Sequence, residues 1–235
     1  MWWFAAIHAN LATLYGRTNA TVTAGERILD AGCGTGGFLA ALARRMPERE
    51  MIGLDADETG CRWAREKSGH PVCAGSVNAL PFGDATFRAI FSVDVLCHRD
   101  VDETRALRQF HRCLSAGGLL ILNLPAYRWL MSRHDAAVYN ARRYTRREIV
   151  RLLREAGFRP IFASYWNMIL FPVMVATRKL LPASAGSDVE LQPRLVEALC
   201  RAATSLERGL MRAGLWLPFG GSVLAVAAKS ESVNV

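Results

Sequence analysis

The segment ILDAGCGTGG, residues 28–37, constrains the fold of this chain more than any other feature. A short apolar run leads directly into a loop with four glycines, and the helical pattern of residues 38–46 follows at once. Glycines let the backbone turn tightly and approach a ligand closely, and the first N–H groups of the next helix point at that ligand. The segment therefore predicts a strand, a ligand-binding loop and a helix in direct succession.

Strand-like and helical patterns alternate along the first 125 residues. Strand-like runs cover residues 27–31, 51–55, 87–93 and 119–124, and helical patterns cover residues 38–46, 58–67 and 103–114. This alternation predicts an α/β fold, with a parallel sheet and helices on both faces. Farther along, a capping box (Thr145 to Glu148) opens a helix that stops at Gly157. A strand over residues 161–166, a long amphipathic helix over residues 195–210 and a last strand over residues 222–228 complete the expected order.

Length and composition are those of one folded domain. The chain has 235 residues, 51% of them hydrophobic, with 29 Lys and Arg against 21 Asp and Glu. A disordered tail would be far less apolar, so we expect a single domain over residues 1–235. None of the six cysteines falls in a C-x-x-C pair, which argues against a zinc knuckle or a secreted disulfide framework. We therefore expect no metal, reduced thiols and a cytoplasmic location.

Three segments lie outside the alternation of strands and helices. Residues 1–17 lack the features of a signal peptide and predict a short amphipathic N-terminal helix. Residues 125–144 and 167–220 occupy positions where substrate-binding lids are usually inserted, and we expect an inserted loop and a C-terminal helical lid there. The uncharged run over residues 160–177 is about as long as a membrane span, but it contains Asn167 and Pro172 and follows a helix stop. We expect a strand and a surface-docked helix in this run.

Two carboxylates near the glycine loop indicate the kind of ligand. Gly32, Gly34 and Gly37 also fit the G-x-G-x-x-G pattern of dinucleotide sites, and Asp55 lies where such sites place the acid that binds ribose. However, Asp30 stands two residues before the first glycine. A carboxylate there suits the ammonium group of an amino-acid ligand and would repel a pyrophosphate. An adenosyl amino acid therefore fits better than NAD.

Several motifs in order resemble those of the class I S-adenosylmethionine-dependent methyltransferases, in particular the broad type 11 group. Residues 28–36 look like the family's first motif, residues 53–57 its second and residues 74–82 its adenine-side motif, while residues 89–98 and 114–122 resemble the fourth and fifth strands with their loops. The loop over residues 124–135 and the Trp2-Trp3-Phe4 start resemble a bacterial subgroup of that family. The resemblance implies a Rossmann-like doubly wound sheet of seven strands with the last strand antiparallel. It also implies an enzyme that uses S-adenosylmethionine and releases S-adenosylhomocysteine.

The same resemblance implies the residues that hold the cofactor. Asp55 would bind the ribose hydroxyls, Gly32 and Gly34 would pass under the methionyl and ribose parts, and the turn at Val93 and Asp94 would face the sulfonium. Many members have an Asp in the adenine motif where this chain has Ser76, whose hydroxyl can still accept from the adenine amine. The full expected set is Asp30, Gly32, Cys33, Gly34, Thr35, Gly36, Asp55, Ala56, Ser76, Val77, Val93 and Asp94.

Candidates for the acceptor side follow the fourth and fifth strands, because ligands of open α/β sheets bind at the carboxyl ends of the strands. His98 and His134 are the expected catalytic residues, with His134 oriented by Asp135 as a general base. We expect the acceptor, with an anionic group among its possible features, to be bound by Tyr127, Arg142, Arg143 and Tyr144. The equally simple alternative is that the His-Asp pair caps a turn and that the arginines form a solvated face.

The sequence favours O-methylation of a small-molecule or lipid- or glycan-linked acceptor, and leaves alternatives open. Asn123-Leu-Pro-Ala-Tyr127 looks like the motif of nucleobase amine methyltransferases, but it follows the fifth strand instead of the fourth. An RNA or protein methyltransferase, a non-catalytic adenosyl-ligand binding protein and a nicotinamide-dependent reductase are the other functions to weigh. The apolar residues of the 160–220 region would suit an acceptor lid, a peripheral membrane contact, or ordinary core and homodimer packing.

Overall fold

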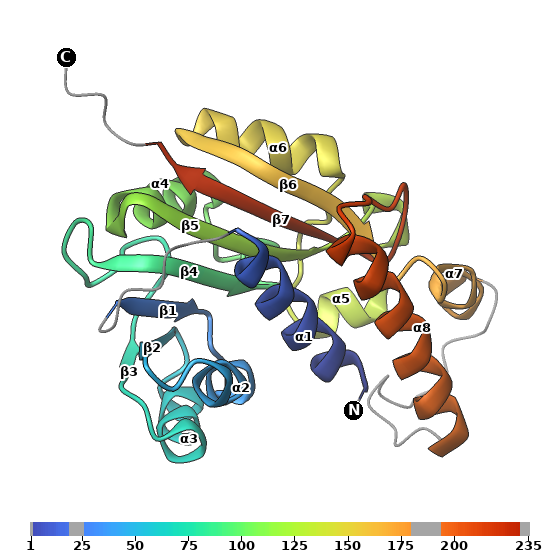
Figure 1. The fold of residues 1–235 in the computed structure, drawn as a ribbon, viewed down its shortest axis with the longest axis horizontal. Helices are drawn as coiled ribbons and strands as arrows, with labels where there is room; N and C mark the ends of the chain where they lie inside the picture. Colours follow the sequence, from blue (N-terminus) through green and yellow to red (C-terminus); the bar gives the residue numbers. More distant parts are fainter. Residues whose placement is uncertain (1, 19–25, 180–193, 231–235) are drawn as a thin grey trace.

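A computed structural model describes residues 2–18, 26–179 and 194–230 (Figure 1). Its sheet has seven strands in the order β3-β2-β1-β4-β5-β7-β6. β7 pairs antiparallel with both β5 and β6, and the other pairings are parallel, so the predicted doubly wound sheet is confirmed. The strands are β1 (Arg27–Ala31), β2 (Glu50–Asp55), β3 (Val72–Ala74), β4 (Phe87–Val93), β5 (Leu114–Pro125), β6 (Phe158–Trp166) and β7 (Ser222–Lys229).

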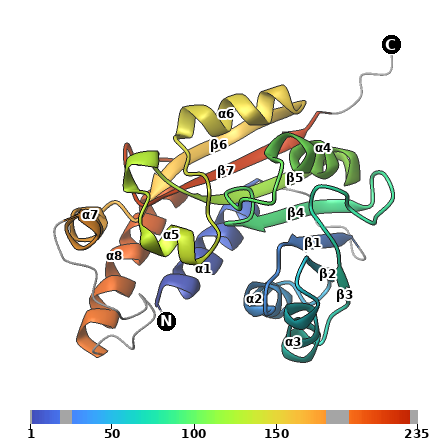
Figure 2. The same ribbon diagram turned by 180° about the vertical axis from the view of Figure 1, so that it is seen from behind.

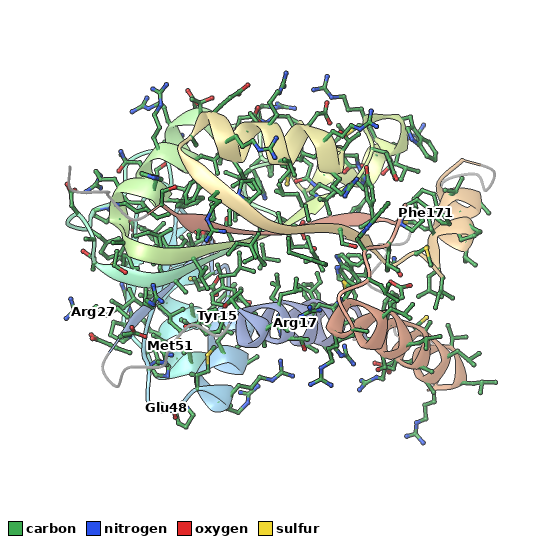
Figure 3. The ribbon with its side chains drawn as sticks, turned by 45° about the horizontal axis from the view of Figure 1, so that its top comes forward. Tyr15, Arg17, Arg27, Glu48, Met51 and Phe171 are labelled. Atoms are coloured by element: carbon green, nitrogen blue, oxygen red, sulfur yellow. The ribbon has the colours of Figure 1, made fainter. Side chains whose placement is uncertain are left out.

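Helices cover both faces of this sheet. α1, α2 and α8 lie on one side, whereas α6 lies on the other, as the tilted view of Figure 3 shows. Figure 2 shows α4 beside α6 when the molecule is seen from behind. The helices are α1 (Trp2–Arg17), α2 (Gly37–Arg45), α3 (Glu58–Ser68), α4 (Glu103–Cys113), α5 (Arg133–Ala137), α6 (Arg146–Glu155), α7 (Phe171–Lys179) and α8 (Arg194–Arg212), with a 3-10 turn η1 (Arg128–Leu130).

Local signals in the sequence explain where several helices begin. Asp57 accepts the N–H groups of Thr59 and Gly60 and so caps α3, and Asp102 caps α4 in the same way. Thr145 and Glu148 form the predicted capping box of α6. These caps fix the ends of helices that follow the carboxyl edge of the sheet, where the candidate site lies.

The structure also contains elements that periodicity did not indicate. β3 has only three residues, too few for an alternating pattern, and β5 begins five residues earlier than the apolar run at 119–124. η1, α5 and α7 lie within the two segments expected to be lids. Of those segments and the N-terminal helix, residues 1 and 180–193 lie outside the described residues, and the lid role itself stays a prediction.

Two apolar clusters, one on each face of the sheet, form the core. One includes Phe87, Phe110 and Leu153 under α4 and α6, and the other includes Leu11, Phe91 and Met211 under α1 and α8. The described parts of the chain contain no helix long and apolar enough to cross a membrane. The run over residues 160–177 instead forms the end of β6 and most of α7, as expected.

The first turn of α1 lies at the carboxyl edge of the sheet. The Trp3 ring stacks on that of Trp166, the last residue of β6, with 4.7 Å between centroids. Farther along α1, the Arg17 guanidinium donates to the Met211 carbonyl of α8. In Figure 1 the parallel strands point toward the side where α5, α7 and the start of α1 lie, so these helices surround the edge at which ligands of such sheets bind.

Candidate cofactor and acceptor site

The glycine loop is held against the neighbouring strand and the loop after β4. The backbone N–H groups of Gly32 and Cys33 both donate to the Leu54 carbonyl, at 2.7 and 2.9 Å. Gly32 has φ +87°, and a Cβ at this position would lie 2.1 Å from Cγ2 of Val95. A side chain is therefore excluded at Gly32, and the β1 loop lies directly against the turn that follows β4.

Gly34 has a left-handed backbone with open space beside it. Its φ is +52°, and a Cβ at Gly34 would meet no atom within 4 Å. Its N–H donates to Oδ2 of Asp55 at 2.7 Å, while Oδ1 of Asp55 accepts the Asp57 N–H at 3.0 Å. These bonds fix the Asp55 carboxylate at the end of β2, next to the open side of the loop. An acceptor so placed fits a pair of vicinal hydroxyls.

Asp30 provides a second carboxylate under the loop. It is buried at the end of β1, and its Oδ2 has no hydrogen-bond partner. Burial, together with the charge of Asp55, raises the pKa of Asp30 to about 7, although the Leu39 N–H acts in the opposite direction. A buried carboxylate with an unsatisfied oxygen would be stabilised by a cation such as an amino-acid ammonium.

The turn after β4 carries a third carboxylate, that of Asp94. Its φ of +55° is uncommon for a residue with a side chain. Burial raises the pKa of Asp94 to about 7, against the opposing effects of Asn123 and Arg143. Because Val95 touches the glycine loop, Asp94 lies beside the place where the reactive end of a bound ligand would be.

The adenine-side motif forms a short loop after β3. Val77 is buried, whereas Ser76 is exposed and its Oγ accepts the N–H of Asn78 at 3.2 Å. The Asn78 side chain then bonds to the backbone of Asp100 and Asp102, which ties this loop to the start of α4. A hydroxyl at Ser76 is thus available to an adenine ring next to β2.

The remaining predicted cofactor residues line or support the same loop. Thr35 is exposed, with Oγ1 accepting from Lys67 at 3.2 Å, and Ala56 is exposed after β2. A Cβ at Gly36 would lie 2.6 Å from Cα of Ala64, so this glycine allows α3 to pack against the loop. Together, the predicted cofactor residues come from the carboxyl ends of β1, β2, β3 and β4, and they fit an adenosyl amino acid.

Comparison with known proteins agrees with this geometry. A family model described as a methyltransferase domain matches residues 28–118. The O-methyltransferase resE of Aspergillus sclerotiorum is 31% identical over 201 residues, which cover 80% of this chain and 74% of resE. The chain belongs to the class I S-adenosylmethionine-dependent methyltransferases.

Other relatives of this methyltransferase extend the likeness. The O-methyltransferase cnsE of Penicillium expansum is 30% identical over 149 residues, 58% of this chain, and the chain spans 53% of the length of cnsE. Among solved structures, a putative sarcosine dimethylglycine methyltransferase from Galdieria sulphuraria superposes with a TM-score of 0.65 at 15% identity, covering 96% of this chain and 86% of that one. This structural likeness concerns the fold alone.

The segment after β5 packs onto the turn after β4. The backbone N–H groups of Ala141 and Arg142 donate to the Cys97 carbonyl, and Asn140 pairs with His98 in an isolated bridge. The Arg142 guanidinium donates to the carbonyls of Leu96, His98 and Val101. Residues 125–144 therefore pack against the turn that follows Asp94. Besides these carbonyls, Nε of Arg142 lies 3.5 Å from Oε2 of Glu103, so the guanidinium is engaged within the protein.

Arg143 forms a buried ion pair within the same segment. Its Nε and Nη2 donate to the two oxygens of Asp135 at 2.9 and 3.0 Å, and Nη1 donates to the Ala126 carbonyl at 3.0 Å. Burial alone would raise the pKa of Asp135, but Arg143 and Ser132 hold it below its ordinary value. Arg143 thus holds the segment together, instead of presenting its charge to an acceptor in this conformation.

The predicted acceptor tyrosines have different surroundings. Tyr144 is buried, and its hydroxyl lies 2.8 Å from the Leu96 carbonyl and 2.7 Å from Oε2 of Glu103. Tyr127 belongs instead to a partly exposed aromatic cluster after β5, stacked on Tyr165 with 5.1 Å between centroids. The cluster consists of Tyr127, Trp129, Tyr165, Phe171 and Phe219. Tyr127 can therefore contact an apolar or aromatic acceptor, whereas Tyr144 mainly supports the turn after β4.

Both candidate histidines lie at the carboxyl edge. His98 is half-buried in the turn after β4, and its N–H donates to the Val95 carbonyl. His134 is partly exposed in the first turn of α5, next to the buried Asp135. Their catalytic roles stay predictions. The sequence indicated no link between Asn123 and Trp166, although Oδ1 of Asn123 accepts from the buried Trp166 indole at 2.7 Å.

Proposed function

We propose that this protein transfers the methyl group of S-adenosylmethionine to a hydroxyl oxygen of a small-molecule or lipid- or glycan-linked acceptor. The observation that carries the proposal is that the carboxylates of Asp30 and Asp55 lie against one glycine loop at the carboxyl edge of the sheet, with Asp94 in the turn whose next residue, Val95, lies against Gly32 of that loop. When bound, the cofactor supplies an electrophilic methyl group on a sulfonium, so the protein need mainly orient the two reactants.

Each carboxylate has a separate task in this proposal. Asp55 holds the ribose hydroxyls, and Asp30 receives the methionyl ammonium, which satisfies its unpartnered oxygen. Asp94 lies on the acceptor side. Its pKa of about 7 suits a general base near neutral pH, and its carboxylate accepts the acceptor's hydroxyl proton as the new bond to oxygen forms.

The aromatic cluster supports an acceptor with an apolar or aromatic part. Trp129 and Phe219 are 51% and 42% exposed, so the cluster is accessible beside the turn that carries Asp94. Oxygen is the favoured atom because two fungal relatives carry the name O-methyltransferase. Arg142 and Arg143 both bond within the protein in this conformation, so they do not favour an acceptor with an anionic group.

The cysteines support a reducing, cytoplasmic location. All six are free thiols, and Cys33, Cys61, Cys97 and Cys113 are buried. Cytoplasmic proteins keep thiols reduced, whereas small secreted domains usually pair them.

The decisive first experiment is a calorimetric titration of the purified protein with S-adenosylmethionine, S-adenosylhomocysteine and NADH in parallel. We expect micromolar binding of both adenosyl ligands and none of NADH. Asp55→Ala should weaken adenosyl binding at least tenfold because two charge-assisted bonds to the ribose are lost. Glu58→Ala, a change of a neighbouring carboxylate at the start of α3, is the matched control and should bind like the parent.

Transfer itself is then measured with a labelled methyl donor and a panel of hydroxylated aromatic, isoprenoid and glycolipid acceptors. Label in an alkali-stable ether would support O-methylation. Label on nitrogen or carbon would contradict the proposed atom, and binding without transfer to any acceptor or cell extract would favour a non-catalytic binding protein. Binding of NADH alone would overturn the function and leave only the fold.

A further inference from the structure

α8 exposes an apolar stripe that no described part of the chain covers. Leu195, Leu199 and Leu206 are 72%, 62% and 60% exposed. Their spacing of four and seven residues places them on one face of the helix, with the exposed Ala202 between them. The buried face of α8 is a different one, formed by Thr204, Glu207 and Met211. The leucines therefore point away from the protein.

A row of arginines runs along α8 between this stripe and the buried face of the helix. Arg194, Arg201, Arg208 and Arg212 follow one another at intervals of seven, seven and four residues, so they share a second face of α8. Arg208 donates to Oδ1 of Asn10, which turns this row toward α1. Of the two acids on the helix, Glu197 pairs with Arg201 and Glu207 is buried, so the positive charge is largely uncompensated.

The C-terminal end of α2 extends this positive surface. Burial and the charges of Arg212 and Arg45 lower the pKa of Arg208, which shows that these guanidiniums lie close together. Arg44 and Arg45 are exposed at the end of α2. Long arginine side chains can lie along an apolar surface while the guanidinium reaches anionic groups above it.

We infer that α8 docks this protein onto an anionic phospholipid bilayer, with the Leu195, Leu199 and Leu206 stripe in the acyl boundary and the arginine row at the phosphates. A helix of this kind lies in the plane of the interface and needs both contributions. A second copy of the chain is a poorer partner, because joining two leucine stripes would bring two arginine rows together. A free anion could bind the arginines but would leave the leucines in water.

The inference goes beyond the proposed methyl transfer, and it gives α8 a fixed position relative to the site. The Glu207 carboxylate accepts the N–H groups of Asn167 and Ile169 at 2.6 and 2.8 Å, directly after β6. Phe171, labelled in Figure 3, begins α7 and belongs to the aromatic cluster. Docking of α8 therefore brings the acceptor edge of the sheet near the membrane surface.

The test is co-sedimentation of the full chain with sucrose-loaded vesicles, either of phosphatidylcholine alone or with about a third phosphatidylglycerol. We expect binding to the anionic vesicles to be at least about tenfold stronger, and to weaken with salt. Leu199→Glu/Leu206→Glu should abolish binding to both. Arg201→Gln/Arg212→Gln should keep residual binding but lose the preference for anionic lipid.

Ile161→Glu is the matched control, because Ile161 is 45% exposed on β6, away from α8. It should bind vesicles like the parent, and circular dichroism should show all variants folded. Equal binding by the leucine variant and the parent would overturn the inference. So would a concentration-dependent dimer, seen by sedimentation equilibrium, that the leucine substitutions dissociate while the parent ignores vesicles. S-adenosylmethionine affinity, measured on the same samples, reports separately on the proposed function.

Discussion

Asn123 forms two hydrogen bonds with Asp94, one through its side-chain amide and one through its backbone carbonyl. Its side-chain Nδ2 donates to Oδ1 of Asp94 at 2.9 Å, and its backbone carbonyl accepts the Asp94 N–H at 2.8 Å. Since the Trp166 indole fills the other end of the same amide, the position of Asp94 depends on β5 and β6 as well as on β4. The left-handed backbone of Asp94 is thus maintained by the centre of the sheet.

Asn123→Ala should destabilise the protein and disturb Asp94. It leaves the buried Trp166 N–H without an acceptor, so we expect the free energy of unfolding to fall by about 1–3 kcal/mol in urea titrations. Ser92→Ala is the matched control, because the buried Oγ of Ser92 has no partner to lose. Equal losses in the two variants would show that the amide does not carry this role.

The rate of methyl transfer should rise with pH through about 7 if Asp94 is the base, because its pKa is raised to about 7 and only the carboxylate accepts a proton. Asp94→Asn should remove this rise and lower kcat by roughly 10²–10⁴-fold, with the affinity for S-adenosylmethionine measured separately by calorimetry. A parent-like pH profile in Asp94→Asn would assign the base elsewhere.

The variants His134→Ala and His98→Ala test whether either histidine, instead of Asp94, is the general base. With Asp94 as the base, each should keep kcat within a few-fold of the parent and retain the same pH profile. The physical reason is position. Asp94 precedes Val95, which lies against Gly32 of the cofactor loop, whereas His134 lies on α5, in the segment that follows β5. A loss of about a hundredfold or more in His134→Ala would instead support the base expected from sequence.

Asp30 should make the unliganded protein less stable as pH rises from about 4 to 7. Its folded pKa of about 7 exceeds the ordinary value of 3.8, so between these values the folded state holds a proton that the unfolded state has lost. Asp30→Asn should flatten this dependence and unfold at higher urea than the parent at pH 8, while binding S-adenosylmethionine less well. Denaturant titrations of both proteins at pH 5 and pH 8 check the sign, and an Asp30→Asn variant with the same pH dependence as the parent would contradict it.

Gly32→Ala and Gly34→Ala should separate folding from cofactor binding. The new Cβ in Gly32→Ala would overlap Val95, so we expect a loss of several kcal/mol in stability or failure to fold. Gly34→Ala meets open space and costs about 1–2 kcal/mol for its left-handed backbone, but the methyl group enters the ligand's side of the loop. We therefore expect a folded Gly34→Ala protein with weakened S-adenosylmethionine binding in calorimetry.

The fold and the cofactor loop could be predicted because their signals are local. A buried strand, a run of glycines and an acid at the end of the next strand stand close together in the sequence, and the structure keeps Asp30, Asp55 and Gly34 together. The capping box at Thr145 likewise marked the start of α6. Such features need no knowledge of which strands are neighbours.

The acceptor side was harder because it depends on pairing between distant segments. From sequence, Arg142 and Arg143 were expected to bind the methyl acceptor. In the structure, an isolated bridge pairs Ala126 with Tyr144, and both guanidiniums donate to backbone carbonyls. Asn123 reaches Asp94 only through the register that opposes it to Val93 in the sheet. One signal was local: Asp135 forms a capping box with Ser132 at the start of α5, which agrees with the expected alternative that the His134-Asp135 pair caps a turn.

β7 fills a place inside the sheet although it is the last described strand in the chain. It joins β5 to β6 along the register from Ala228 to Ser222, and β6 has no other partner in the sheet. During synthesis, β6 must therefore wait, unpaired, until residues 222–229 leave the ribosome. Pairing of β7 therefore completes the sheet. It also fixes Trp166, which lies opposite Ser222 at the carboxyl edge. A chain cut before residue 222 would lack β7 and leave β6 without a partner, so two of the seven strands would be lost together.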